Sequence, residues 1–158
     1  MLFLQLFRWK TCIFKQIILS LQKIKHTMIA TIAEIEKFLN EFKQKVEIFD
    51  IIFYDGRGKN IDTLAALDII PNQRKEIIKK ITVTDYSEGP ITNLLDKLGD
   101  LWVFGKEVNG QEVYIKICYG LPNRQTICIS FHIAEYPMKY PYKKDKKWRK
   151  KAVMKTAF

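Results

Sequence analysis

The dipeptide Asn109-Gly110 constrains the fold of this chain more than any other feature, because it lies between two apolar-rich runs. Both central residues of a two-residue hairpin turn need positive φ angles, which asparagine and glycine tolerate. We therefore predict an antiparallel hairpin formed by these two runs. Counting outward from the turn predicts the cross-strand pairs: Val108 with Gln111, Gly105 with Tyr114, and Val103 with Lys116.

A third strand is predicted after the hairpin. Gly120, Pro122 and Asn123 form a turn signal before the apolar residues of 126–132. A loop centred near Pro122 gives two further pairs: Ser130 with Tyr114, and His132 with Glu112.

Side chains alternate between the two faces of a strand, so the three strands sort into an apolar and a polar face. The apolar face, which we expect to join the core, carries Trp102, Phe104, Val113, Ile115, Ile117, Ile127, Ile129 and Phe131. The polar face carries Glu112, Tyr114, Lys116, Ser130 and His132, with Cys128 in the same alternation. An acid–base group, a cation and a phenol therefore gather on one face, although each alone is typical of an ordinary sheet surface.

Three segments that contain these residues resemble the MqsR-type toxins of bacterial toxin–antitoxin systems, in the RelE-like superfamily of messenger-RNA endoribonucleases. They are DYSEGP at Asp85–Pro90, LWVFGKEVNGQEVYIKI at Leu101–Ile117, and CISFHIAEYPMKYP at Cys128–Pro141. The resemblance covers Ala30 to Tyr142. It implies an α+β fold in which a curved antiparallel sheet carries N-terminal helices on one face. It also implies metal-independent mRNA cleavage that inhibits translation and growth, with a neutralising antitoxin as protein partner.

With the activity that the resemblance implies, the polar face has suitable groups for catalysis. Cleavage without metal uses the 2′-hydroxyl of RNA as nucleophile, so the protein must move protons and stabilise charge on the phosphate. His132 suits proton transfer, because imidazole titrates near neutral pH. Lys116 is suited to stabilising the charge on the phosphate, and Tyr114 is suited to orienting the phosphate. Glu112, if it lies opposite His132, would favour the protonated imidazole. Ser130 is expected to be a neighbour, since no Ser/His/Asp arrangement is evident.

Two positions depart from the family pattern. Some relatives have a lysine where this chain has Ser87 or Glu88, and some have a glutamine where Val103 stands. Both departures remove a candidate catalytic helper. The alternative function is therefore a catalytically inactive RNA-binding or partner-binding module of the same fold.

Four basic residues are candidate contacts for RNA phosphate: Arg57, Lys59, Lys106 and Arg124. The first two belong to the turn at 55–60, whose GRGK sequence lacks the spacing of a Walker motif. An ordinary exposed loop and a phosphate contact both remain open there. The same holds for a basic face predicted on the helix that begins at Pro71, either solvated or facing RNA or a partner: Arg74, Lys75, Lys79 and Lys80.

Helical signals precede the sheet. Thr31 and Glu34 form a capping box, and apolar residues follow at helical spacing, so we predict a helix from Ile32 to Lys45. Residues 46–54 are predicted as a strand. A short helix to Leu67, capped by Asn60 or Asp62, is expected next. Then follows a helix from Pro71 to Ile81 with three inward residues: Ile77, Ile78 and Ile81.

The basic charge belongs to the two ends of the chain. The formal net charge is +10, of which residues 1–27 carry +5 and residues 138–158 carry +8, leaving −3 for the middle. We predict a toxin domain at 28–142 and a disordered basic tail at 143–158, in which Trp148 has base stacking as an alternative role. For residues 1–27 three interpretations remain open: an interfacial helix, a helix packed on the domain, or sequence upstream of initiation at Met28.

Three cysteines without a metal-ligand spacing indicate neither a disulfide framework nor a zinc site. We expect no cofactor and no metal requirement. No apolar run reaches the length of a membrane span, so no membrane partner is expected. A reducing cytoplasm is the simplest location for the chain.

Overall fold

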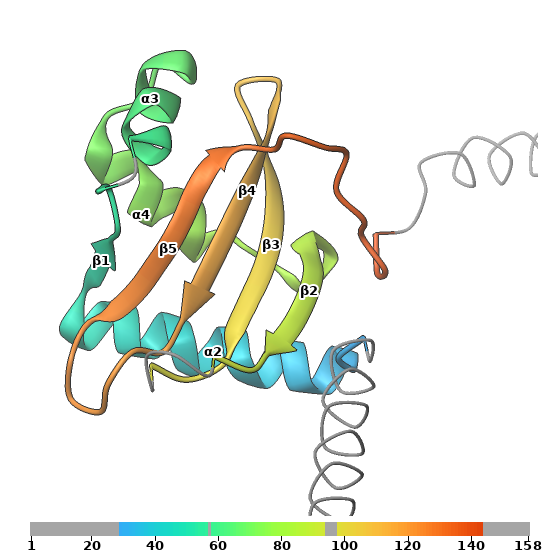
Figure 1. Ribbon diagram of the computed structural model, residues 1–158. Coiled ribbons are helices and arrows are strands. Elements are labelled where there is room, and N and C mark those ends of the chain that lie inside the picture. Colours follow the sequence, from blue (N-terminus) through green and yellow to red (C-terminus); the bar gives the residue numbers. More distant parts are fainter. Residues whose placement is uncertain (1–28, 57, 94–97, 144–158) are drawn as a thin grey trace, which may run out of the picture.

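The computed structural model describes residues 29–56, 58–93 and 98–143, which form an α+β fold (Figure 1). The sheet has five strands in the order β1-β5-β4-β3-β2 and does not close. β1 (Ile51–Phe53) pairs in parallel with β5 (Thr126–Ile133), whereas the other neighbours are antiparallel. The predicted class is therefore confirmed, but the sheet is mixed instead of wholly antiparallel. The regions 1–28 and 144–158 lie outside the described residues. The three interpretations of residues 1–27 and the predictions for the basic tail and Trp148 therefore concern residues that the structure does not describe.

The first described helix, α2 (Ile32–Phe49), begins at the predicted capping box. The Thr31 hydroxyl accepts from the Glu34 N–H at 3.3 Å, and the Glu34 carboxylate accepts from the Thr31 N–H at 2.8 Å. The helix runs four residues beyond its predicted end, because Val46 continues the buried stripe. Residues 46–49 were therefore wrongly predicted as strand. The chain leaves the helix at Asp50, whose φ is 71°.

The predicted hairpin is confirmed in β3 (Leu101–Val108) and β4 (Gln111–Cys118). Its register has the three predicted pairs, from Val108 with Gln111 to Val103 with Lys116. A further strand, β2 (Tyr86–Ile91), pairs with β3 at the edge of the sheet, after a 3₁₀ turn at Val83–Asp85.

The predicted register of β5 is wrong by two residues. His132 lies opposite Tyr114, and Ser130 lies opposite Lys116. The pairing also shifts between Ser130 and Cys128, which leaves Ile129 in a β-bulge. A bulge adds one residue to one strand and so reverses the face on which earlier side chains lie. Cys128 consequently faces the core cluster. Ile127 is buried, as predicted, but lies outside that cluster, and Ile129 is only partly buried.

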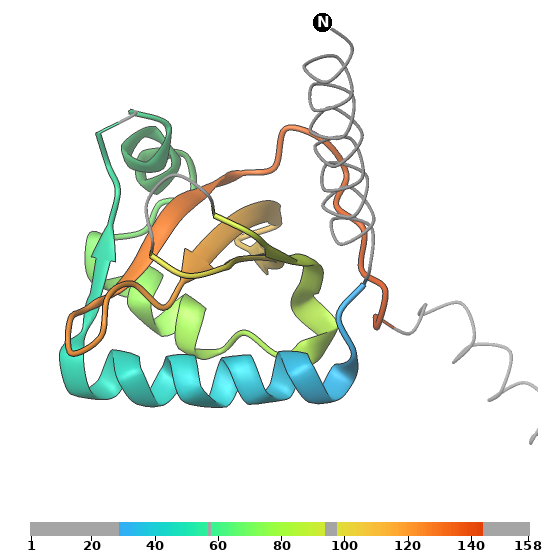
Figure 2. The same ribbon diagram turned by 60° about the horizontal axis from the view of Figure 1, so that its bottom comes forward.

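Helices cover one face of the sheet and leave the other open. α2 and α4 (Pro71–Lys79) pack on the same face, and Figure 2 shows α2 running beneath the strands. In α4, Ile78 and Ile81 beyond its end are buried and Ile77 is partly buried, as predicted. Arg74 corrects the predicted basic face: it is buried and binds Asp55.

The remaining helix, α3 (Lys59–Ala66), lies along the edge of β5. Its N-cap is Gly58, not Asn60 or Asp62 as predicted. The buried Asn60 side chain instead accepts from the Phe131 N–H at 3.0 Å and donates to the Tyr54 carbonyl at 2.6 Å. These bonds satisfy backbone groups where β1 has ended, and they fix the start of α3 against the sheet. Within the described part of the chain, every helix is too short or too polar to cross a bilayer.

Candidate functional site

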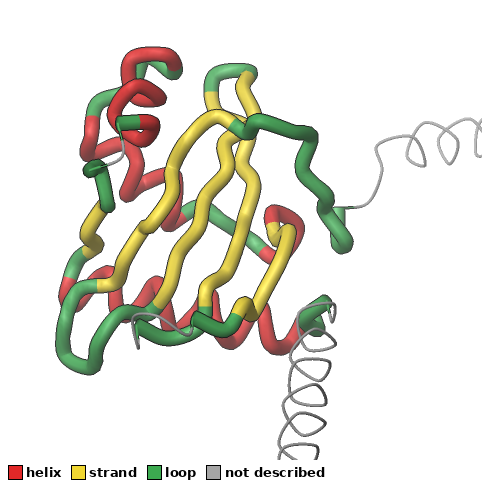
Figure 3. The backbone as a smooth tube through the Cα atoms, in the orientation of Figure 1, coloured by secondary structure: helices red, strands yellow, loops and turns green. Residues whose placement is uncertain are grey.

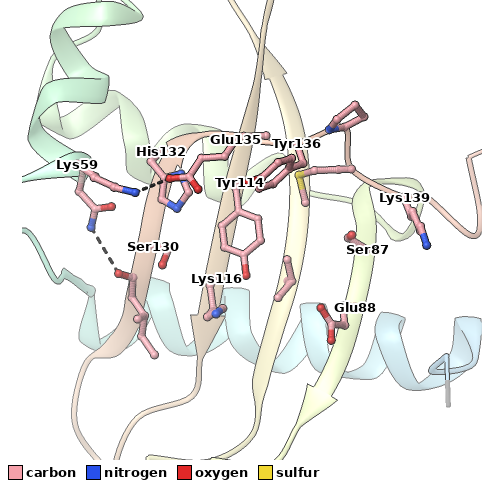
Figure 4. Close-up of a pocket in the computed structure, with 16 residues that line it drawn as sticks. Lys59, Ser87, Glu88, Tyr114, Lys116, Ser130, His132, Glu135, Tyr136 and Lys139 are labelled. Atoms are coloured by element: carbon pink, nitrogen blue, oxygen red, sulfur yellow. Dashed lines mark hydrogen bonds and ion pairs between the residues drawn. The ribbon is translucent and has the colours of Figure 1, made fainter. Parts of the chain in front are cut away.

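The open face of the sheet contains a hollow of about 940 Å³. Its floor consists of side chains from β3, β4 and β5, and the start of α3 and the edge strand β2 contribute to its sides. Figure 4 shows the polar side chains on the face opposite to α2. Three predicted catalytic residues line this hollow together: Tyr114, Lys116 and His132.

An irregular segment, residues 134–142, which we call the strap, follows β5, and its residues 134–139 form one wall of the hollow. It leaves β5 and crosses the hairpin end of the sheet without helix or strand structure (Figure 3). The Ala134 N–H donates to the Glu112 carbonyl at 2.7 Å. The Glu112 carboxylate accepts from the Met138 N–H at 3.0 Å and from the Tyr140 hydroxyl at 2.6 Å. Glu112 therefore anchors the strap at three points.

This anchoring corrects the predicted role of Glu112. In the sheet it lies opposite Glu107, not opposite His132. Both of its carboxylate oxygens accept hydrogen bonds from the strap. Glu112 supports the wall of the site and does not serve as the partner of the imidazole.

His132 lies on the polar face of β5, opposite Tyr114 of the central strand β4. Its ring stacks on that of Tyr114, with centroids 5.2 Å apart and an interplanar angle of 19°. Nδ1 is 2.9 Å from the Ile133 carbonyl oxygen. Because a carbonyl only accepts, Nδ1 carries the hydrogen, and the neutral imidazole keeps its lone pair on Nε2. This tautomer leaves Nε2 as the proton-accepting atom.

Lys116 is the next residue on the same face of β4. Its ammonium nitrogen lies 5.5 Å from the centroid of the Tyr114 ring, within the range of a cation–π contact. Ser130 lies opposite Lys116 and also lines the hollow, as a neighbour of the three candidate catalytic groups.

A carboxylate that the sequence pattern did not indicate lies beside His132. Glu135, the second residue of the strap, forms an ion pair with Lys59, which lies in the first turn of α3. The hydrogen bond from Lys59 lowers the pKa of Glu135, and the charges of Lys59 and His132 lower it further. Glu135 thus remains ionised and lies within electrostatic reach of the imidazole.

The four predicted phosphate-binding residues fare differently. Lys59 lines the hollow. Lys106 lies on the helix-covered face, where its ammonium group is 2.7 Å from an Asp85 oxygen and 3.2 Å from the Lys80 carbonyl, so it is not part of the site. Arg124 is exposed in the loop between β4 and β5, at the end of the sheet opposite the Asn109-Gly110 turn. Arg57 lies outside the described residues.

The two positions that depart from the family pattern also line the hollow. Ser87 and Glu88 come from β2, and the buried Val103 comes from β3. Where the resemblance implies a cation and an amide, the site therefore has a hydroxyl, a carboxylate and an apolar side chain.

Metal ligands do not cluster in the described residues: no three His, Cys, Asp or Glu side chains come together there. Cys118 and Cys128 are buried free thiols, and burial raises the pKa of Cys128. Comparison with known protein families, curated proteins and solved structures finds no match for this chain.

Proposed function

We propose that this protein is a toxin of a toxin–antitoxin system, similar to the MqsR type with a RelE-like fold. It cleaves mRNA as a metal-independent endoribonuclease, in the cytoplasm, and thereby inhibits translation and growth. A cognate antitoxin protein neutralises it. The observation that carries the proposal is the convergence of Tyr114, Lys116 and His132 in one hollow.

The orientation of His132 supports proton transfer in this reaction. With Nδ1–H directed to the Ile133 carbonyl, Nε2 is the atom that takes the proton of the attacking 2′-hydroxyl. The same atom can return a proton to the departing 5′-oxygen. The products are a cyclic phosphate and a free 5′-hydroxyl end.

The neighbouring groups support the remaining steps. Lys116 stabilises the charge that develops on the phosphate oxygens, and the Tyr114 hydroxyl orients the phosphate. Glu135 lies within electrostatic reach of the ring that takes the proton, and Lys59 holds that carboxylate in place. DNA lacks the nucleophile and is not cut by this route.

Controlled expression of the full chain tests the proposal. Wild type, His132→Ala and Lys116→Ala are expressed in a bacterial host while growth is recorded and new 5′-hydroxyl ends in cellular RNA are mapped. We expect recurrent cuts and growth arrest only with wild type, because loss of an acid–base group costs about 10²–10⁴-fold in rate. Lys37→Ala, an exposed lysine on α2, is the matched control and retains activity. Folded, soluble wild-type protein that yields no new ends would contradict the proposal.

The metal-independent part of the proposal has its own test. Purified protein should cut RNA equally well with and without EDTA. Activity that disappears with EDTA and returns with an added divalent cation would contradict it.

Glu88 and Val103 favour a second candidate function, because they replace two possible catalytic helpers inside the hollow. In that case the protein is a binding module for RNA or for a protein partner. It would bind its ligand in the hollow without producing 5′-hydroxyl ends, and His132→Ala would not change growth.

A further inference from the structure

The strap presents a large aromatic side chain to solvent at the hollow. Tyr136 lines the hollow and is 80% exposed, more than any other large hydrophobic side chain among the described residues. Aromatic rings usually contribute to folding by burial, which this ring does not do. Figure 4 places Tyr136 on the strap side of the site, close to the catalytic candidates on β4 and β5.

The backbone that carries Tyr136 is held on both sides. The preceding Ala134 N–H and the following Met138 N–H both donate to Glu112, and Pro137 fixes its own φ angle. When the backbone is already ordered, binding restricts only the side-chain torsions of the ring. Tyr136 is therefore prepared for stacking at a small entropic cost.

The charges around the hollow favour an anionic ligand. The lining contains Lys59, Lys116 and Lys139 against Glu88 and Glu135, and His132 adds a further cation when it is protonated. The middle of the chain is acidic, so this excess of positive charge is local. An exposed ring next to a group of cations is the arrangement with which proteins hold a base and its phosphates.

We propose that Tyr136 is a base-stacking residue, and that it holds an unpaired nucleotide next to the scissile phosphate. The inference rests on the proposed function and adds its substrate class: single-stranded RNA, loops or ends. In an RNA helix the faces of a base are covered by its neighbours, so the ring has nothing to stack on. A single strand offers a free base face at every position.

Binding of an uncleavable RNA tests this site without relying on catalysis. The probe is a short single strand of mixed sequence with 2′-methoxy groups, containing a fluorescent purine analogue whose emission is quenched by stacking. The full chain should bind it more tightly than the same sequence annealed to its complement. With a probe series, emission should fall strongly when the analogue occupies one position.

Substitution of Tyr136 gives the expected magnitude. Because base–aromatic stacking contributes about 1–3 kcal/mol, Tyr136→Ala should weaken binding by about 5- to 150-fold and abolish the quenching. Tyr136→Trp should restore both. Tyr54→Ala is the matched control, because Tyr54 is also an exposed tyrosine but does not line the hollow, and it should bind as wild type does.

The outcomes separate this inference from the proposed function. Tight, quenched binding that depends on Tyr136, without any cleavage of ordinary RNA, would support the stacking site and overturn the enzyme. Cleavage with unchanged binding by Tyr136→Ala would support the enzyme and overturn the stacking site, which would make Tyr136 a candidate contact for a protein partner. Equal affinity for single and double strands would also overturn it.

Discussion

Arg74 is a buried cation that the fold holds through one carboxylate. Its guanidinium group donates to the two oxygens of Asp55 at 2.7 and 3.0 Å, and it lies 4.0 Å from the centroid of the Phe53 ring. In the described part of the chain its Nε has no hydrogen-bond partner. The ion pair connects α4 to the residues that follow β1.

Removal of Asp55 should therefore destabilise the protein strongly. Asp55→Ala leaves the buried guanidinium without compensation, and we expect the free energy of unfolding in urea to fall by about 3–5 kcal/mol. The double variant Asp55→Ala/Arg74→Met should recover much of this stability, because it leaves no unpaired charge buried at this position. Glu36→Ala, an exposed acid on α2, is the control and should change little. A double variant less stable than Asp55→Ala would contradict this account.

Two tyrosines link the stability of the fold to alkaline pH. Burial, and then the hydrogen bond to Glu112, raise the pKa of Tyr140. Burial and Glu41 raise the pKa of Tyr119 in the same way. The folded state therefore keeps both phenols protonated at a pH where the unfolded chain ionises them.

The sign of the pH dependence follows from these raised pKa values. Their contribution to stability is complete below the unfolded pKa of about 10 and is lost as the pH rises above it. Urea unfolding at a series of pH values should show this decline, and Tyr119→Phe/Tyr140→Phe should make the alkaline fall shallower. Ultraviolet titration of the folded protein should show that Tyr119 and Tyr140 resist ionisation, together with Tyr86, whose pKa burial also raises. Ordinary titration of every phenol would contradict the prediction.

At the level of whole elements, the hairpin was predictable because one dipeptide determines it. A two-residue turn determines the register of the two strands. Every cross-strand pair from Val108–Gln111 to Val103–Lys116 therefore follows from the position of the turn. The capping box likewise determined the start of α2. Both are local signals, in which the residues that decide the structure are close together in the sequence.

The β5 register was not predictable because its deciding contacts are distant in the sequence. The loop of residues 119–125 permits several offsets, and the bulge at Ile129 coincides with hydrogen bonds to Asn60 on α3. Alternation alone therefore put Cys128 on the wrong face. Ser130 and His132 follow the bulge and lie on the predicted face, so the sequence pattern still identified the candidate site residues on β5.

The sequence predicted the site residues on the strands, which form the floor of the hollow, but not those on the strap, which form one wall. Strand periodicity identified Tyr114, Lys116 and His132, whereas Glu135 and Tyr136 belong to the strap, which has no period from which a face can be inferred. The two prolines and three tyrosines of residues 134–142 do indicate an aromatic segment with restricted backbone angles. The position of the strap over the sheet depends on hydrogen bonds to Glu112. These bonds join residues that are distant in the sequence, so no local pattern predicts them.

The strap crosses the sheet at Gly105, and this crossing can be tested. A Cβ atom at Gly105 would contact the Tyr140 hydroxyl and would lie 2.7 Å from the Met138 sulfur. Gly105→Ala should therefore displace the strap, lower the free energy of unfolding by about 1–3 kcal/mol and weaken the binding of single-stranded RNA. Gly56→Ala is the control, because nothing lies within 4 Å of its added Cβ. Unchanged stability and binding in Gly105→Ala would contradict the close crossing.

At the scale of the whole molecule, the charge is divided between an acidic middle and basic ends. Such ends attract RNA through long-range interactions that salt screens. Replacing the five Lys and Arg residues at 146–151 with serine should lower RNA affinity and make it less dependent on salt. The log–log slope should fall by about 0.7 for each RNA phosphate that the tail no longer neutralises. The cut positions should remain the same, since the hollow is unchanged. A shift in cut positions would show that the tail selects sequence.

The hydrogen bond between Tyr142 and Ala30 brings the two borders of the domain together. The Tyr142 hydroxyl donates to the Ala30 carbonyl at 2.7 Å, so the first and the last described segments of the domain meet at one corner. Lys139 of the hollow lies on the strap that leads to this corner. We therefore expect encounter with RNA to proceed in two stages: capture by the basic residues at the ends of the sequence, then transfer to the hollow. Tethering at the first stage raises the effective concentration of substrate at the second, so a weak site in the hollow can still be occupied rapidly.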